Sequence, residues 1–514
     1  MRTQLRTKVI AGVAVALVLV LPSPTSASPG ATRPPGTAPA AAGQAAGRGF
    51  SHAEARALLE QVRAALDPRT PAARTSALPR ADLTMALRDL RRALPALTPA
   101  ERASATSALA AFPPPSSTCG GLLGSAVVKT AHFCVHYGNG NTAWATTTAD
   151  VLENVWSTEV DGLGFQHPPY DGDGLFDVYL QNLGAGYYGA CAPNQNAPQS
   201  TSSCVLDDDF DPAQFGGTPA MSSLQVTAAH EFFHAVQFGY DTTEDIWLME
   251  GSAVWAEEQV YPTINDYLQY LPYSALTHPA TPVDYKGVTS TDLYYRYGAV
   301  LFWKFLSGEL QDPGIIRRVW EYAAVPGYYS LVAVTAALGE RGWSFAHAFA
   351  RFGVWNTGVP GYDDRALYPG PVWWQTATLG RRHRDTGTRT VALDHLTNAS
   401  LLVAPARRLP KRTRLRVRVD APALDRMSQA TVQVRHRDGS VSLVDVPLDG
   451  AGDGSVRLGF DPRLVGAIVV TLTNASTRMS ACGSDSADRF ACAGLSADDT
   501  LPFSIRATVR LRKR

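Results

Sequence analysis

The sequence predicts an α+β protein in which a domain of mixed helices and strands is followed by a domain made of strands. Between residues 119 and 356, segments of helical periodicity surround two short alternating segments, 132–137 and 175–180, whereas beyond residue 388 apolar and polar residues alternate with period two. Several short strands at this spacing indicate a C-terminal β-sandwich. The clearest of these late strands are 415–419, 430–434, 455–458 and 467–472.

The mixed domain is expected to run from strand to helix to strand and then into a helical part. The amphipathic segment 146–160 separates the two strands, and residues 263–356 are mainly helical in pattern. The clearest helices of this later part are 299–310, 315–324 and 331–338.

The first 118 residues carry the features of processing segments. Basic residues precede an apolar run that ends at Leu21 and is too short to span a bilayer, and a small-residue cleavage site follows at Ala27. An Ala- and Arg-rich helical stretch then ends at a Pro/Ser break, which favours a propeptide; a helical cap that stays in place is the alternative. We expect a signal peptide 1–27, a linker 28–48, propeptide-like helices 49–112 (53–66 and 83–94), a linker 113–118, the mixed domain 119–387 and the β-sandwich 388–514.

Composition and cysteine spacing are typical of a secreted globular protein. The 46 basic and 46 acidic side chains cancel, so no nucleic acid or other polyanion is implied as a partner of the protein as a whole. No segment after the signal peptide reaches membrane-spanning length without charge, so no membrane contact is expected. Pairing of neighbouring cysteines is the simplest pattern and suits an extracellular location. The expected disulfides are Cys119–Cys134, Cys191–Cys204 and Cys482–Cys492.

The strongest chemical signal is the pentapeptide His230-Glu-Phe-Phe-His234. Histidines four residues apart lie on one face of a helix, so both imidazoles can reach the same metal ion. Zinc accepts imidazole nitrogen and carboxylate oxygen, and a hydrolytic zinc keeps three protein ligands and leaves its fourth position to water. Glu231 then lies where it can take a proton from that water.

The helix that carries this motif is predicted to be buried. Ser222 and Gln225 form a capping-box pair at its expected start, and Gly239 predicts its end. The residues between are apolar almost all round, so the polar side chains among them need partners. A metal ion would be the partner of the two histidines; a buried histidine pair in a metal-free helix bundle is the alternative.

A second helix, expected from residue 243 or 245 to residue 261, supplies the third ligand, for which Glu250 is the best candidate. Asp241 and Glu244 in the preceding loop are the alternatives. Glu257 lies on the same helix face as Glu250, where it would orient a ligand histidine or, alternatively, point into solvent.

Three blocks of the sequence resemble the gluzincin zinc metallopeptidases: the pentapeptide, Trp-Leu-Met-Glu-Gly-Ser-Ala at 247–253, and Tyr-Arg-Tyr-Gly at 295–298. The resemblance is to the aminopeptidase-like branch and, more closely, to secreted bacterial metalloproteases with a Glu-Gly-x-Ala-x-Trp block. The segment that the aminopeptidases use to hold a substrate amine is absent, which favours an endopeptidase or another enzyme that is not an aminopeptidase. A metzincin pattern is excluded, since Gln237 and Tyr240 stand where it needs glycine and a third histidine.

The resemblance implies a thermolysin-like fold, in which a strand-containing lobe and a helical lobe close around the zinc. It implies zinc ligation by His230, His234 and Glu250 and base catalysis by Glu231. It also implies that Tyr295 stabilises the oxyanion, with Tyr294, Tyr297 and His278 as the alternatives that the residues leave open.

Asp171, Asp173 and Asp177 lie in a glycine-containing segment that resembles oxygen-rich calcium loops but lacks the remaining ligands of an EF-hand. A tight turn before a strand explains these residues equally well, so calcium is the weaker prediction.

The sequence thus predicts a secreted zinc metallopeptidase that hydrolyses proteins or peptides. Two other classes remain open: a catalytically silent secreted binding or adhesion protein, and a zinc hydrolase of non-peptide substrates.

Overall fold

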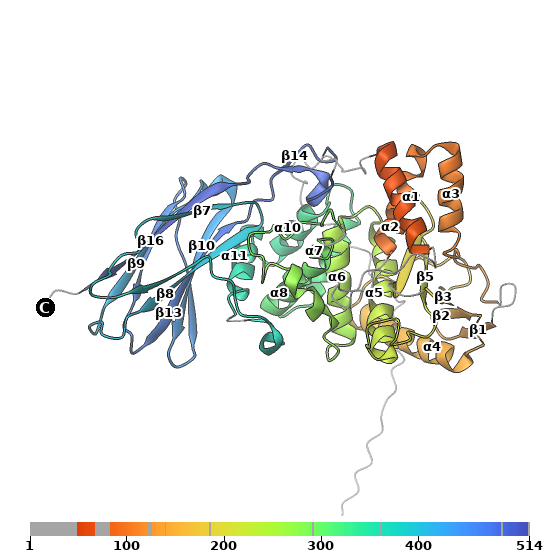
Figure 1. Cartoon of the computed structure of the whole chain (residues 1–514), viewed down its shortest axis with the longest axis horizontal. Helices are drawn as coiled ribbons and strands as arrows, with labels where there is room; N and C mark the ends of the chain where they lie inside the picture. Colours follow the sequence, from red (N-terminus) through yellow and green to blue (C-terminus); the bar gives the residue numbers. More distant parts are fainter. Residues whose placement is uncertain are drawn as a thin grey trace, which may run out of the picture. The chain divides into compact units, whose positions relative to one another are not determined.

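The computed structural model describes residues 49–66, 83–120, 126–138, 140–183, 187–289, 292–358, 361–484 and 487–511. The expected signal peptide and the 28–48 linker lie outside these residues. The described part is an α+β structure with several sheets, as the sequence predicts (Figure 1). None of its helices is long and apolar enough to cross a bilayer.

A five-stranded sheet organises the first half of the described chain. Its order is β1-β2-β3-β5-β4, with β2, β3 and β5 parallel and with β1 and β4 antiparallel at the two edges. The strands expected at 132–137 and 175–180 are confirmed as β2 and β3. The bounds are β1 Ala126–Lys129, β2 Phe133–Tyr137, β3 Phe176–Gln181, β4 Gly189–Pro193 and β5 Ser202–Asp207.

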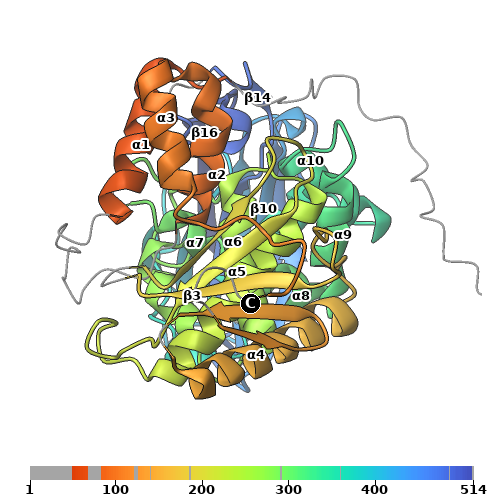
Figure 2. The same ribbon diagram turned by 90° about the vertical axis from the view of Figure 1, so that its right-hand side faces the viewer.

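Helices cover both faces of this sheet, so β2, β4 and β5 are buried along their whole length (Figure 2). On β5, Cys204 and Leu206 pack into the main core with α4 and α5, whereas Val205 packs with the N-terminal helices. The expected helices at 53–66 and 83–94 are present as α1 and α2. The bounds are α1 His52–Leu66, α2 Thr84–Ala93, α3 Pro99–Leu109, α4 Thr142–Trp156 (continued by the π-helix Ser157–Gly162) and α5 Ala220–Tyr240.

Both expected ends of α5 are wrong. The helix begins at Ala220 after Pro219, so Ser222 lies inside its first turn and no side chain caps it. Proline already has the φ angle of a helix start and leaves no N–H to satisfy there. At the other end the helix runs through Gly239 to Tyr240. Gly239 is required instead for close packing, because a Cβ there would lie 3.1 Å from Cδ of Pro169.

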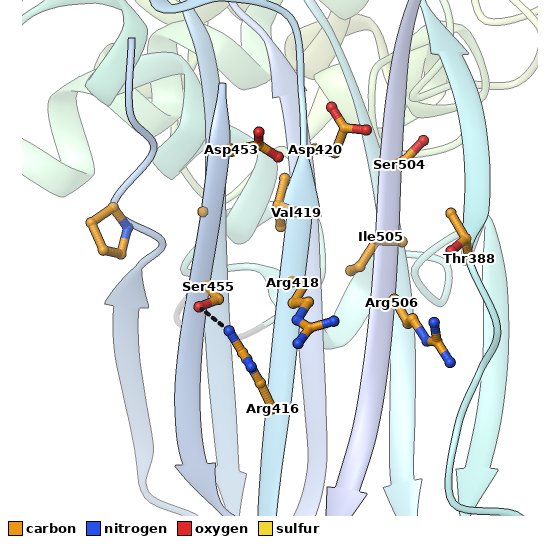
Figure 3. A pocket seen from close by; sticks show the side chains of 12 residues that line it. Thr388, Arg416, Arg418, Val419, Asp420, Asp453, Ser455, Ser504, Ile505 and Arg506 are labelled. Atoms are coloured by element: carbon orange, nitrogen blue, oxygen red, sulfur yellow. Dashed lines mark hydrogen bonds between the residues drawn. The ribbon is translucent and has the colours of Figure 1, made fainter. Parts of the chain in front are cut away.

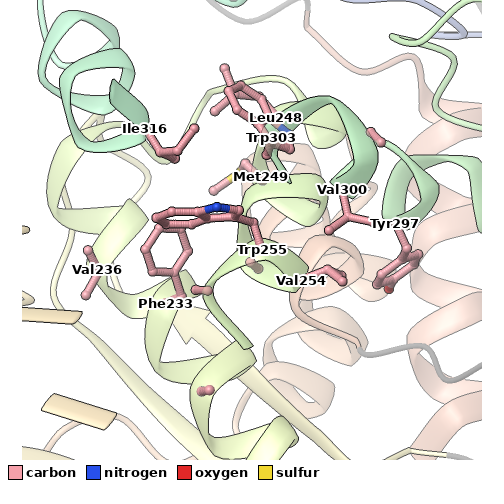
Figure 4. Packing of buried hydrophobic residues seen from close by; sticks show 14 of the residues in the cluster. Phe233, Val236, Leu248, Met249, Val254, Trp255, Tyr297, Val300, Trp303 and Ile316 are labelled. Carbon is pink, nitrogen blue, oxygen red and sulfur yellow. The ribbon is translucent and has the colours of Figure 1, made fainter. Parts of the chain in front are cut away.

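The helical part packs around α6 through buried tryptophans. Trp247 and Trp255 of α6 and Trp303 of α8 are fully buried. Figure 4 shows Trp255 and Trp303 within this cluster. Gly251 allows this packing, because a Cβ there would approach Nε1 of Trp303 to 2.6 Å. The later helices confirm the expected helical part. The bounds are α6 Ile246–Val260, α7 Tyr295–Gly298, α8 Val300–Leu310, α9 Gly314–Ala323, α10 Leu331–Glu340 and α11 Phe345–Trp355.

Two further sheets, which we call the C-terminal sheet pair, share one apolar core. Their orders are β11-β10-β13-β8-β6 and β12-β9-β16-β7. The strands of this pair begin before residue 388, the expected start of the domain. β6, which ends at Leu379, pairs in parallel with β8. The bounds are β6 Gln375–Leu379, β7 Arg389–Leu393, β8 Thr397–Pro405, β9 Arg414–Asp420, β10 Ser428–His436, β11 Val441–Asp445, β12 Asp453–Gly459, β13 Val465–Asn474 and β16 Leu501–Arg510; β14 Met479–Ser480 and β15 Leu495–Ser496 form a separate ribbon.

Buried ion pairs join the C-terminal residues to the helical part. The ring of His395 lies 3.1 Å from the carboxylate of Asp284 and 2.6 Å from that of Asp499. Burial opposes the charged imidazolium, but the two carboxylates outweigh burial and raise the pKa of His395 to about 10. Beside this pair, Lys286 bridges Asp245, which precedes α6, to Asp488 at 2.8 and 2.6 Å.

The three disulfides expected from neighbour pairing are confirmed: Cys119–Cys134, Cys191–Cys204 and Cys482–Cys492. Such bonds are typical of proteins in oxidising compartments.

Candidate metal centre

Two buried helices bring the three predicted ligands together. Helix α5 contributes His230 and His234, and α6 contributes Glu250. The two Nε2 atoms lie 3.1 Å apart, and Oε2 of Glu250 lies 3.4 Å from Nε2 of His230 and 3.5 Å from that of His234. The two alternatives for the third ligand have other partners. Asp241 accepts a hydrogen bond from the N–H of Thr243, and Glu244 accepts one from the N–H of Ser330.

The outer ring nitrogens of both histidines are held by side-chain oxygens. Nδ1 of His230 lies 2.7 Å from Oε1 of Glu257, and Nδ1 of His234 lies 2.7 Å from Oε1 of Gln237. When these oxygens accept, each Nδ1 carries the proton and each Nε2 presents a lone pair to its neighbours. The expected orienting role of Glu257 agrees with this contact.

Gln237 was not predicted as a functional residue. Its amide nitrogen donates to the carbonyl of Met249 at 2.9 Å and to Oγ of Ser252 at 3.1 Å, which turns its oxygen towards His234. It therefore ties α5 to α6 next to the ligands. The available signal was a polar side chain three positions after His234 on an otherwise apolar helix.

The three inner atoms fit a tetrahedral metal ion. Zinc bonds to nitrogen and oxygen of about 2.0–2.1 Å place neighbouring ligand atoms roughly 3.3 Å apart, close to the observed separations. Oε2 of Glu250 is buried, and no hydrogen-bond donor within the described ranges reaches it. An unpaired buried carboxylate oxygen facing two imidazole nitrogens is costly unless a cation lies between them.

Glu231 lies beside this cluster and is held by a residue of the N-terminal helices. The hydroxyl of Thr84, the first residue of α2, donates to Oε2 of Glu231 at 2.8 Å and accepts from the backbone N–H of Cys191 on β4 at 2.8 Å. The side chain of Glu231 packs against Gly189, where only a glycine fits: a Cβ at residue 189 would lie 2.9 Å from Cγ of Glu231. Glu231 is 2% exposed, so the described site is closed.

More of α2 packs over the same region. Arg88 is buried, donates to the carbonyl of Glu244 and lies 2.7 Å from the sulfur of Met249, one residue before Glu250. Met85 belongs to the main core. The first residues of α2 therefore lie between β4 and the N-terminal end of α6.

The tyrosines near residue 295 divide between two environments. Tyr295 lies among the rings of Tyr273, His278 and Tyr285, at 5.5–6.0 Å between centroids. Tyr297 lies instead with its ring centroid 6.0 Å from that of His230. Of the two, Tyr297 is the one whose ring contacts a predicted ligand, His230.

Two further carboxyl groups lie near His230. Burial raises the pKa of Glu257 to about 7, against the lowering effect of its hydrogen bond to His230. Burial also raises the pKa of Glu159 well above its usual range, and neither of its oxygens has a hydrogen-bond partner in the described part of the chain.

The predicted calcium segment remains a weaker candidate. Asp177 is occupied by His136 at 2.6 Å and by the N–H of Ser116 at 2.6 Å. Burial and the neighbouring carboxylates raise the pKa of Asp171 to about 6. Cys134, which lies near His136 and Asp177, is in a disulfide and offers no thiolate.

Comparison with known proteins identifies no family for this chain. No protein-family model matches the chain, and no curated protein matches it. A solved structure described as a family GH115 4-O-methyl-alpha-glucuronidase, with specificity for decorated arabinogalactans, aligns at 8% identity over 69% of this chain. The chain spans 54% of that structure's length, with a TM-score of 0.14, which is too low to indicate a shared fold.

Proposed function

We propose that the chain is a secreted zinc metallopeptidase, most simply an endopeptidase. The observation that carries the proposal is the group of His230, His234 and Glu250, whose facing atoms lie 3.1–3.5 Å apart, with Glu231 beside them. In this proposal the first sheet and the following helices form a thermolysin-like catalytic domain, and the C-terminal sheet pair is a β-sandwich domain.

The roles of the residues follow from their positions. A zinc ion bound there would supply Lewis acidity and a lowered pKa for a water molecule. Glu231 would take the proton of the attacking water and return it to the leaving amine. Glu257 and Gln237 would keep the histidine Nε2 atoms free for the metal. We transfer the oxyanion role from Tyr295 to Tyr297, because its ring lies against His230.

A peptide substrate is supported by the strand beside Glu231. β4 is an edge strand, and an edge strand offers N–H and C=O groups to an extended chain. Thr84 takes up the N–H of Cys191 on this edge, and Arg91 donates to the carbonyl of Asn194 just beyond the strand. Residues 49–112 would therefore act as a propeptide that covers both the base and the edge where a substrate would lie.

Zinc content and peptide cleavage test the proposal together. Wild type, with and without residues 49–112, should bind about one zinc per chain, and His234→Ala should lose most of it. Glu231→Gln should keep zinc but lose nearly all cleavage of casein or a peptide library. Glu258→Gln is the matched control: it lies on α6 and pairs with Lys304 at 3.0 Å, away from the ligands.

The outcomes separate the rival functions. Zinc without peptide cleavage, but with Glu231-dependent hydrolysis of esters or other bonds, would favour a non-peptide hydrolase. No hydrolysis by any form would favour a silent binding protein. No zinc in any form would refute the metal centre.

A further inference from the structure

The solvent face of one C-terminal sheet carries six arginines on three neighbouring strands. Register places them directly opposite one another as three pairs on β12, β9 and β16. Their inward neighbours, such as Leu415 and Val417, fill the core, so the arginines point away from it. The pairs are Arg457–Arg416, Arg418–Arg506 and Arg414–Arg510.

This face, which we call the arginine face, has few counter-charges. Arg506 pairs with Asp385 at 2.9 Å, and Arg416 donates to the hydroxyl of Ser455 at 3.4 Å. Within the residues that the structure describes, no carboxylate pairs with Arg414, Arg418, Arg457 or Arg510. Burial and the neighbouring arginines lower the pKa of Arg416. Like charges directly opposite on adjacent strands destabilise a sheet, so the arrangement costs stability that a bound anion would recover.

A depression of about 580 Å³ lies in this face (Figure 3). Arg416, Arg418 and Arg506 line one part of it, and Asp420, Asp453 and Ser504 line another. Asp420 and Asp453 are opposite each other in the register. The depression therefore offers donors for acid groups and, next to them, acceptors for hydroxyl groups.

We propose that the arginine face binds an acidic polysaccharide. Arginine forks match carboxylate and sulfate groups, and here they repeat at roughly 5 Å across strands and 7 Å along them, so one chain can meet several. The aspartates would accept from sugar hydroxyls. Because the net charge of the whole protein is zero, the total charge does not reveal this local concentration of arginines.

Two other anionic partners fit less well. Among the described residues that line the depression there is no aromatic ring, so nucleic-acid bases find no surface there on which to stack. Among the described residues, no large apolar side chain is exposed on β7, β9, β12 or β16, so the face has nothing to insert into a membrane.

Binding of defined polymers to the full chain tests the proposal. Calorimetry with polygalacturonate and dextran sulfate should give binding that weakens as salt rises, whereas neutral dextran should not bind. Arg416→Gln/Arg418→Gln should lose about tenfold in affinity for both acidic chains. Arg407→Gln/Arg408→Gln, which removes the same charge from an exposed loop, should stay within about twofold. Peptide cleavage should not change in either variant.

Stability gives an independent readout. Removing two mutually repelling arginines should leave the melting temperature equal or higher, so lost binding cannot be ascribed to unfolding. The proposal is overturned if neither acidic chain binds, if dextran binds equally, or if the Arg416/Arg418 variant binds as wild type does. It is also overturned if a single-stranded oligonucleotide or phosphatidylglycerol vesicles bind more tightly than both acidic polysaccharides.

Discussion

Replacing Thr84 by valine should release part of the inhibition that we ascribe to residues 49–112. Valine keeps the shape of threonine but removes the hydroxyl. That hydroxyl donates to Glu231 and accepts from the N–H of Cys191, both at 2.8 Å, and Thr84 is fully buried. In the closed form of the variant both groups lose this partner, and both meet water when α2 moves away.

The size of the effect follows from these two hydrogen bonds. A bond to a charged group contributes about 1.5–3 kcal/mol, and an unsatisfied buried N–H costs about 1–3 kcal/mol. Because water can enter part of the space, we expect the closed form to lose about 3 kcal/mol relative to the open form. At about 1.4 kcal/mol per factor of ten, the open fraction rises on the order of 100-fold. Arg88 and Met85 still hold α2, so the variant stays mostly closed.

The assay is the initial rate of cleavage of a quenched fluorescent peptide by protein that still carries residues 49–112, with gels to confirm that it stays unprocessed. Thr84→Val should raise this rate about 100-fold, up to the rate of protein that begins near Ser116. Thr106→Val, an exposed change on α3, should have no effect. If Thr84→Val cleaves no faster than wild type while the shortened protein is highly active, the hydroxyl does not hold the site closed.

Three further changes probe other contacts. Gly189→Ala should push Glu231 aside, so zinc content by metal analysis should persist while kcat falls at least tenfold; full activity would contradict the packing argument. Tyr297→Phe should lower kcat by about 10²–10³ with little change in KM, whereas Tyr295→Phe should retain most activity; the reverse result would restore the original assignment. His395, with a pKa raised to about 10, should stabilise the fold fully below its unfolded pKa of about 6.5 and lose this as pH rises to 10. Urea unfolding of wild type and His395→Asn should therefore differ by a few kcal/mol at pH 6 and converge at alkaline pH; a constant difference would contradict the linkage.

Patterns of several residues predicted the elements well, and single-residue signals predicted their ends poorly. Period-two and helical spacing gave the order of strands and helices, because burial of one face imposes that spacing over a whole element. The expected cap at Ser222 failed because Pro219 starts the helix one turn earlier. Gly239 looked like a terminator but is needed for contact with Pro169, a residue far away in the sequence.

The same limit applies to the candidate metal centre. Spacing on one helix pairs His230 with His234, whereas the choice of Glu250 over Glu244 depends on how α6 leaves its loop, which tertiary packing decides. Tyr295 and Tyr297 are two residues apart, and the four-residue helix α7 turns only the second towards His230. No local pattern distinguishes them.

The N-terminal helices supply a hydrogen-bond donor to one of the buried carboxylates of the candidate site. Glu231, Glu250 and Glu257 are buried near His230, where ionised carboxylates are costly without cations or hydrogen-bond donors. A metal ion would offset that cost for Glu250, and His230 partners Glu257. In the proposed mechanism Glu231 has to be available for proton transfer once the site is open. If residues 49–112 are a propeptide, as we propose, a donor on this segment would satisfy both requirements, since Thr84 donates to Glu231 in the closed form and this hydrogen bond would be lost when α2 departs.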